Sequence, residues 1–149
     1  MSKIILLDSG PLGMISNPKS NYCQDCKQWF NDLLSRGQDI ILPEIADYEI
    51  RRELIRAGKT AGIRRLDQLK YLMVYCPITT ETMLLAAELW AQARQAGTPT
   101  ADPKALDGDV ILAAQAKLLE TEEIQVTIAT TNVGHLSQFV DAREWQQIN

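Results

Sequence analysis

Residues 3–11 decide the fold class of this chain. They read Lys-Ile-Ile-Leu-Leu-Asp-Ser-Gly-Pro, so a short apolar run is followed at once by residues that favour turns. An apolar strand without alternating polar positions is buried on both faces, and such strands belong to parallel sheets covered by helices. We therefore predict that residues 3–7 form a strand of a parallel sheet and that Asp8 lies at its carboxyl end.

Short apolar strands alternate with helices along the rest of the chain. Further strands are expected at residues 38–42, 73–77 and 125–129, with an edge strand at 142–146. Helices are expected at residues 21–36, 43–57, around 63–69, 79–96 and 107–120, with a short helical turn at 132–139. A loop is expected at residues 98–105. The order indicates an α/β fold with a mainly parallel central sheet of four or five strands and helices on both sides.

Composition excludes several classes of protein. The chain has 149 residues, 46% of them apolar, which suits one domain of residues 1–149 with a real core. Nineteen acidic against fifteen basic side chains leave a net charge of −4. This balance argues against a protein that coats nucleic acid by neutralising phosphates, but not against an enzyme that handles nucleic acid through metal ions.

Cysteine content and hydropathy indicate the compartment. Three cysteines, an odd number, favour a reducing environment over a disulfide framework. Cys23 and Cys26 are interpreted as core residues, because one histidine and the remote Cys76 do not complete a four-ligand zinc site. The apolar run at the start is too short for a signal peptide or a membrane span, and no later segment is long enough. We therefore expect a cytoplasmic protein without a membrane anchor.

Acidic residues are the first candidates for chemistry. Asp8 is expected at the carboxyl end of a strand, where functional groups of open α/β sheets gather, although it could also only cap a helix or form a turn. Asp107 and Asp109 precede an apolar helix, where capping is again the alternative. Carboxylates held about 5 Å apart would repel by roughly 3 kcal/mol, and cations would remove that repulsion. Mg²⁺ or Mn²⁺ is expected, because these ions prefer carboxylate and water oxygens.

Other polar residues have structural alternatives of the same weight. Glu49 is expected on the polar face of its helix, where it could simply pair with Arg52. Thr130 and Asn132 follow the last core strand, where both residue types commonly cap the next turn. His135 is the only histidine, and a lone histidine is more often structural than a ligand.

The order of these residues resembles that of PIN-domain ribonucleases, particularly the VapC-like toxins of toxin–antitoxin pairs. The most specific segment, residues 109–116, reads Asp-Val-Ile-Leu-Ala-Ala-Gln-Ala and is similar to the family pattern Asp-x-x-Ile-Ala-Ala-x-Ala. Asp8 after the first strand, Glu49 on a helix and the segment Thr130–Asn132 after the last core strand complete the likeness. It spans residues 4–139 and implies a single PIN-like domain.

The resemblance also implies an activity and its residues. A member of this family would be a metal-dependent endoribonuclease that hydrolyses RNA phosphodiester bonds with Mg²⁺ or Mn²⁺. Asp8, Glu49 and Asp109 would be the acidic metal ligands, Asp107 would add a nearby carboxylate, and Thr130 would fix the site by hydrogen bonding.

Two residues depart from the family pattern. The family's last motif usually has an acidic residue or Asn in the pattern Thr-x-Asp/Asn, followed by another Asp before Phe, and here Asn132 and His135 stand in those places. Asn132 can still coordinate an ion through its amide oxygen or orient a water. The departure leaves open a second hypothesis, a PIN-like domain that binds RNA or a protein partner without catalysis.

A basic stretch offers candidates for contact with RNA. Residues 51–70 carry seven basic side chains against two acidic ones, a local balance of +5. The candidates for the RNA backbone are Arg51, Arg52, Arg64 and Arg65, with a solvated helical face as the alternative. The family likeness further implies a cognate antitoxin and a homodimer, with partner contacts on the helices between Tyr22 and Leu72.

Overall fold

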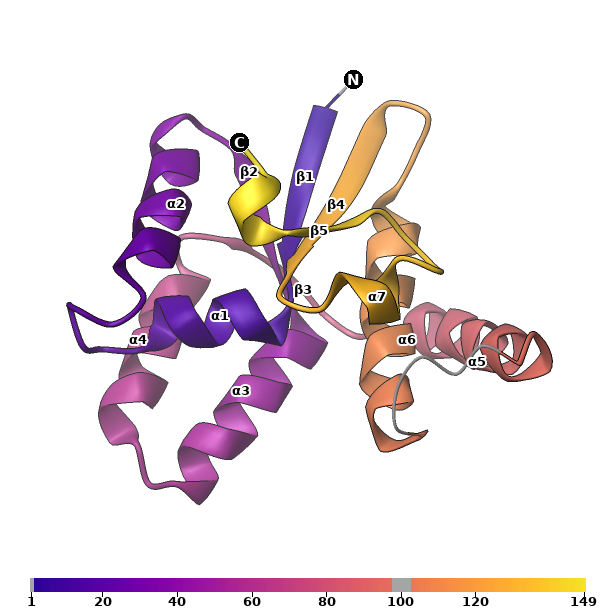
Figure 1. The fold of residues 1–149 in the computed structure, drawn as a ribbon, viewed down its shortest axis with the longest axis horizontal. Coiled ribbons are helices and arrows are strands. Elements are labelled where there is room, and N and C mark those ends of the chain that lie inside the picture. The colour runs from indigo at the N-terminus through magenta and orange to yellow at the C-terminus, as the bar shows by residue number, and fades with distance from the viewer. Residues whose placement is uncertain (1, 98–102) are drawn as a thin grey trace.

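The computed structural model describes residues 2–97 and 103–149. In these residues, five strands form one wholly parallel sheet in the order β3-β2-β1-β4-β5 (Figure 1). The strands are β1 (Ser2–Leu7), β2 (Asp39–Pro43), β3 (Val74–Cys76), β4 (Ile124–Thr130) and β5 (Ala142–Glu144). The predicted α/β fold with a parallel sheet is confirmed, and the edge strand β5 is parallel as well.

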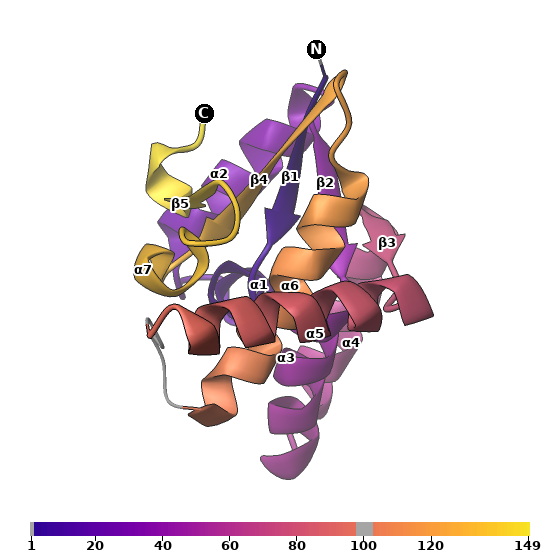
Figure 2. The same ribbon diagram turned by 90° about the vertical axis from the view of Figure 1, so that its right-hand side faces the viewer.

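Helices cover both faces of the sheet (Figures 1 and 2). One face packs against α1 (Ser9–Ser16), α2 (Gln24–Ser35) and α4 (Thr60–Lys70). The other face packs against α6 (Pro103–Leu119) and α7 (Val133–Leu136), and α5 (Thr80–Gln95) lies across α6 on the outside. The helix α3 (Glu44–Arg56) begins at the carboxyl edge of the sheet, which is the edge where the parallel strands end. Within the described residues, no helix combines the length and apolarity needed to cross a membrane.

The first strand lies at the centre of the sheet, between β2 and β4. Ile5 and Leu7 join the core on the α1 and α2 side, whereas Leu6 joins the core on the α6 side. All three side chains are buried. This confirms the strand buried on both faces that the opening stretch predicts, and it places Asp8 at the middle of the carboxyl edge.

Ser9, Gly10 and Pro11 do not form the expected turn but the first turn of α1, so that part of the prediction is wrong. The helix begins here because the Asp8 side chain accepts a hydrogen bond from the Ser9 amide at 2.7 Å. Pro11 fits because amides in the first helical turn have no partner within the helix. The first helical bond runs from the Leu12 amide to the Asp8 carbonyl at 3.1 Å.

The helix α6 also begins earlier than expected, at Pro103 instead of residue 107. Proline is favourable in a first helical turn, because its φ angle is already helical. Residues 103–105 of the expected loop therefore belong to the helix, and residues 98–102 lie outside the described part of the chain. As a result, Asp107 and Asp109 belong to the body of the helix and are not its caps.

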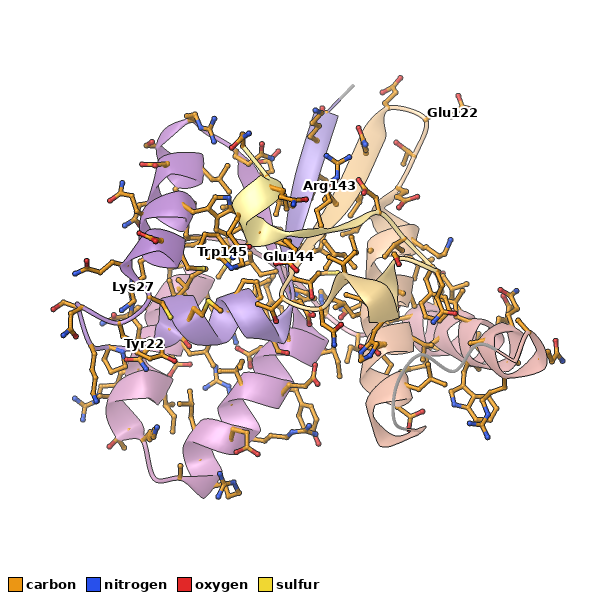
Figure 3. All side chains as sticks on the ribbon, in the orientation of Figure 1. Tyr22, Lys27, Glu122, Arg143, Glu144 and Trp145 are labelled. Atoms are coloured by element: carbon orange, nitrogen blue, oxygen red, sulfur yellow. The ribbon has the colours of Figure 1, made fainter. Side chains whose placement is uncertain are left out.

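The chain end packs back onto the sheet. After β5, the 3-10 helix η1 (Trp145–Gln147) replaces the end of the expected strand at 142–146. Figure 3 shows Trp145 on the α2 side of the sheet, where its ring centroid lies 5.7 Å from that of Trp29. Trp29 also donates to the Ile148 carbonyl at 2.7 Å. These aromatic contacts hold α2 against the sheet, and no prediction from periodicity contained them.

Candidate active site

Asp8 is held in place from both sides of its carboxylate. Oδ1 accepts from the Ser9 amide, and Oδ2 accepts from the hydroxyl of Thr130 at 2.8 Å. Thr130 is fully buried at the end of β4, and its hydroxyl also accepts from the Asn132 amide at 2.9 Å. The parallel pairing of β1 with β4 brings these strand ends together, and the Asp8 amide donates to the Ala129 carbonyl at 2.9 Å. Thr130 therefore lies at the carboxyl edge with its hydroxyl on the Asp8 carboxylate.

Asp109 reaches the same edge from α6. Its Oδ2 atom is buried and has no hydrogen-bond partner among the described residues. The pKa of the Asp109 carboxyl rises to about 6, mainly because burial disfavours its charged form. His135 opposes this rise, whereas the negative charge of Asp8 adds to it. An uncompensated buried carboxylate is a position where a cation would be favourable.

Glu49 approaches from α3 and faces α6. A Cβ atom at Gly108 would lie 3.2 Å from Oε2 of Glu49, so the absence of a side chain at Gly108 makes room for this carboxylate. Burial raises the pKa of Glu49, Asp8 and Asp109 add to the rise, and Arg52 opposes it. Arg52 itself lies over the ring of Tyr48, 5.0 Å from its centroid. Glu49 is therefore half-buried beside the other two carboxylates and is not a surface residue.

His135 and Asn132 complete the group from α7 and the residue before it. The side-chain amide nitrogen Nδ2 of Asn132 lies 3.0 Å from Nδ1 of His135, within hydrogen-bond distance. The same Nδ1 atom lies 3.8 Å from Oδ2 of Asp109. Five residues from four separate segments of sequence thus surround the carboxyl edge: Asp8, Glu49, Asp109, Asn132 and His135.

Asp107 does not join this group. It is exposed, and two positions along a helix correspond to about 200° of rotation, so it lies on the opposite side of α6 from Asp109. The expectation that Asp107 adds a nearby carboxylate came from the family resemblance. Because α6 runs from Pro103 to Leu119, both aspartates lie within the helix and their side chains point in different directions.

The four candidate arginines lie outside the acidic group, and two of them are already engaged. Arg51 binds Asp47 through two hydrogen bonds of 2.9 and 3.1 Å, and it binds Asp67 at 2.8 Å. Its pKa is raised above the usual arginine value, chiefly by the bond to Asp47. Arg51 therefore ties α3 to α4, and Arg52 lies over Tyr48.

Arg64 and Arg65 lie on α4. They line a surface hollow of about 850 Å³ with side chains of α2 and the segment before it, and none of the candidate carboxylates lines that hollow.

Two polar residues that no motif singled out for a role brace the edge. Gln115 is buried within the apolar helix α6, and its amide nitrogen donates to the Cys76 carbonyl at 2.7 Å while its oxygen accepts from the Ile45 amide at 3.4 Å. Glu44 accepts from the Ile78 amide at 2.7 Å. Both therefore connect the helices of the site to the ends of β2 and β3. A polar residue in an otherwise apolar helix is the signal that would have identified Gln115.

The donor set suits a hard divalent cation. Carboxylate oxygens are the ligands that Mg²⁺ and Mn²⁺ prefer, and Oδ2 of Asp109 offers one with no other partner among the described residues. Within those residues, no three histidine, cysteine or acidic side chains are already close enough to share one ion. The carboxylates of Asp8, Glu49 and Asp109 therefore have the donor chemistry that such an ion prefers, but within the described residues they are not gathered around one position.

In comparisons of sequence, no protein-family model and no curated protein matches this chain. In comparisons of structure, several solved structures are similar to it. VapBC2 from Rickettsia felis, bound to a DNA fragment from its promoter, contains a chain with a TM-score of 0.71 and 14% identity, covering 95% of this chain and 98% of that one. VapBC-1 from nontypeable Haemophilus influenzae gives a TM-score of 0.70 and 14% identity, covering 97% and 99%.

DNA-bound VapBC from Salmonella typhimurium gives a TM-score of 0.62 and 18% identity, covering 97% of this chain and 99% of that one. At these identities the likeness establishes the fold. The chain has the PIN-like α/β architecture that its sequence pattern predicts, over almost its full length.

Proposed function

We propose that this chain is a metal-dependent endoribonuclease that hydrolyses RNA phosphodiester bonds and acts as the toxin of a toxin–antitoxin pair. One observation carries the proposal: Asp8, Glu49 and Asp109 come from three separate elements, and at one edge of the sheet the charge of Asp8 raises the pKa values of both Glu49 and Asp109. A fold keeps such a repulsive group only at a cost in stability, which a bound cation would offset. The shared fold with VapBC structures supports the assignment.

Each residue has a part that follows from its contacts. Asp8, Glu49 and Asp109 would hold Mg²⁺ or Mn²⁺. The bound ion would supply an activated water and stabilise the charge that develops on the phosphate. Thr130 keeps the Asp8 carboxylate oriented, and the missing side chain at Gly108 leaves space for Glu49.

The partners of the similar structures suggest partners for this chain. Those structures are VapBC complexes, so we propose a cognate antitoxin that covers the carboxyl edge and blocks RNA. We further propose that residues 1–149 act as one domain, as a homodimer, in the cytoplasm. Exposed apolar side chains on α3 and at the end of α4 are available for protein contacts: Tyr48, Ile55, Tyr71 and Leu72.

Cleavage of RNA by the purified protein tests the proposal. Wild-type protein should cleave single-stranded RNA in the presence of Mg²⁺ or Mn²⁺, and Asp8→Asn should lower the rate by a factor of about 100 or more. Asp39→Asn is the matched control, because it makes the same chemical change at an exposed strand end. Equal rates for wild type and Asp8→Asn would refute the assignment.

The contact between Asn132 and His135 favours a second candidate, an RNA-binding or protein-binding module without catalysis. These two side chains contact each other at 3.0 Å, and neither supplies the late carboxylates that the family commonly has at these positions. Calorimetric titration with Mn²⁺ separates the candidates. A nuclease should show an ion site that depends on Asp8, whereas a binding module should show none.

A further inference from the structure

His135 has an unusual relation to Asp109. Its Nδ1 atom lies 3.8 Å from Oδ2 of Asp109, which is beyond hydrogen-bond distance. The carboxylate oxygen is buried and has no hydrogen-bond partner among the described residues. A ring nitrogen and a carboxylate oxygen thus face each other with a gap between them.

The size of this gap fits one shared metal ion. Two ligand atoms that each lie about 2.1 Å from an ion are about 3 Å apart at right angles and about 4.2 Å apart on opposite sides. The observed 3.8 Å lies between these limits. The pair therefore needs little movement to bind the same ion.

The contact with the side chain of Asn132 indicates which nitrogen of the His135 ring carries no proton. The Asn132 amide nitrogen, 3.0 Å from Nδ1, can only donate, so Nδ1 accepts and carries its lone pair. A lone pair on a neutral ring nitrogen is what a metal ion requires. Asn132 is exposed, so its amide can turn away when an ion takes that lone pair. Asn132 is therefore a positioning residue, because its side-chain amide donates to Nδ1 and holds the His135 ring in this protonation form.

We infer that His135 is a nitrogen ligand which, together with Asp109, makes this site selective for a first-row transition-metal ion over Mg²⁺. Mg²⁺ keeps oxygen ligands and waters, whereas transition-metal ions bind imidazole readily. The inference rests on the proposed function, because it concerns the ion of that same site. It replaces an open choice between Mg²⁺ and Mn²⁺ with a preference set by one residue.

The single histidine allows a direct spectroscopic test. Protein without a histidine tag, labelled with ¹⁵N only at histidine, is loaded with Mn²⁺ and examined by pulsed electron paramagnetic resonance. Because His135 is the only histidine, any ¹⁵N coupling of a directly bound imidazole comes from it. We expect that coupling in wild type and its loss in His135→Ala. Bound Mn²⁺ without the coupling would overturn the inference.

Affinities for the two ions give an independent measure. His135→Asp, which restores an oxygen ligand, should shift the ratio of Mn²⁺ to Mg²⁺ affinity toward Mg²⁺ by about tenfold. Ser137→Ala, an exposed neighbour, should leave the ratio unchanged. If His135→Ala instead strengthened Mn²⁺ binding, the imidazole would be only an ionic partner of Asp109, and the inference would be wrong.

The role of His135 and the proposed function fail in different ways. If wild type binds no Mn²⁺ and Asp8→Asn changes nothing, there is no metal site, and the proposed function fails together with the inference. If wild type binds Mn²⁺ in an Asp8-dependent manner but without histidine coupling, only the role of His135 is refuted. Thermal unfolding of each variant confirms that it is folded before either result is used.

Discussion

The acidic edge of the sheet and the basic stretch at residues 51–70 differ in whether their charged side chains have partners. In the basic stretch, Arg51 binds two aspartates, Arg56 binds Glu53 at 2.8 Å, and Lys70 lies over the ring of Tyr75. At the acidic edge, the charge of Asp8 raises the pKa of Asp109, and Oδ2 of Asp109 has no hydrogen-bond partner among the described residues. The fold therefore pairs several of its basic side chains internally, whereas it leaves this carboxylate oxygen without a hydrogen bond. Local charge density alone does not identify a binding surface, because paired charges are already neutralised.

The largest effect expected in this comparison is on Arg51. Arg51→Met should lower the free energy of unfolding by about 3 kcal/mol, because it leaves the buried carboxylate of Asp47 without its partner. Urea unfolding measures this change. Arg56→Met is the matched control in the same helix, and it should have little effect because its pair with Glu53 is exposed. Equal losses in both variants would show that Arg51 is not a structural tie.

Asp109 should behave in the opposite way, because its charge destabilises the ion-free protein. The folded chain binds its proton more tightly than the unfolded chain, so stability falls as pH rises from about 4 through 6. With chelator at pH 7.5, Asp109→Asn should therefore raise the free energy of unfolding by on the order of 2 kcal/mol.

The gain from Asp109→Asn should vanish only well below the ordinary carboxyl pKa of 3.8, where the wild-type carboxyl is neutral in both states. Asp107→Asn, an exposed change two residues away, should give no gain at either pH. Thermal or urea unfolding at both pH values checks this. A stability gain that did not depend on pH would mean that burial of charge is not its cause.

A substitution at Gly108 should change ion binding without lowering stability. Gly108→Ala should weaken Mn²⁺ binding several-fold, because the new Cβ would lie 3.2 Å from Oε2 of Glu49 and push that carboxylate aside. The same change should keep or slightly raise stability, since alanine favours a helix interior by about 1 kcal/mol. Calorimetric titration and thermal unfolding measure the two effects. Gly134→Ala, with open space around it, is the control, and equal Mn²⁺ affinities in both variants would argue against this role for Gly108.

The smallest effect is expected at Arg64 and Arg65. Replacing both with alanine should weaken RNA binding a few-fold and reduce its salt dependence, because two phosphate contacts would be lost. Binding is measured over a range of salt concentrations with Asp8→Asn protein, which prevents cleavage. Unchanged binding would assign these residues to a solvated helical face and confine RNA contacts to other surfaces.

Some features of the molecule follow from local sequence and others do not. The apolar run at residues 3–7 was sufficient to predict a strand of a parallel sheet, because a strand buried on both faces lacks alternating polar residues. Its central position in the sheet was not predicted. The sequence likewise allowed either Thr79 or Thr80 as the cap of the helix at 79–96, and the structure uses Thr79, whose hydroxyl accepts from the Thr82 backbone amide at 3.1 Å. Such features depend on neighbours within one turn or one strand.

The features that escaped prediction depend on distant residues or on helical phase. The second partner of Arg51, Asp67, lies on another helix, and no pattern within α3 specifies it. The separation of Asp107 from Asp109 follows from the start of α6, which lies beyond the reach of the apolar pattern. Gly108 gains its importance only because Glu49 of α3 packs opposite it.

The connection from Thr130 to His135 has a consequence for how this protein can change over evolutionary time. Its first residue anchors Asp8, and its last residue lies near Asp109, so one short segment contacts the proposed metal ligands on two different elements. Under the proposed function, substitutions there would alter the choice of ion without disturbing the sheet or its core. Related chains with the same scaffold would then diverge in metal requirement by exchanging a few residues of this connection.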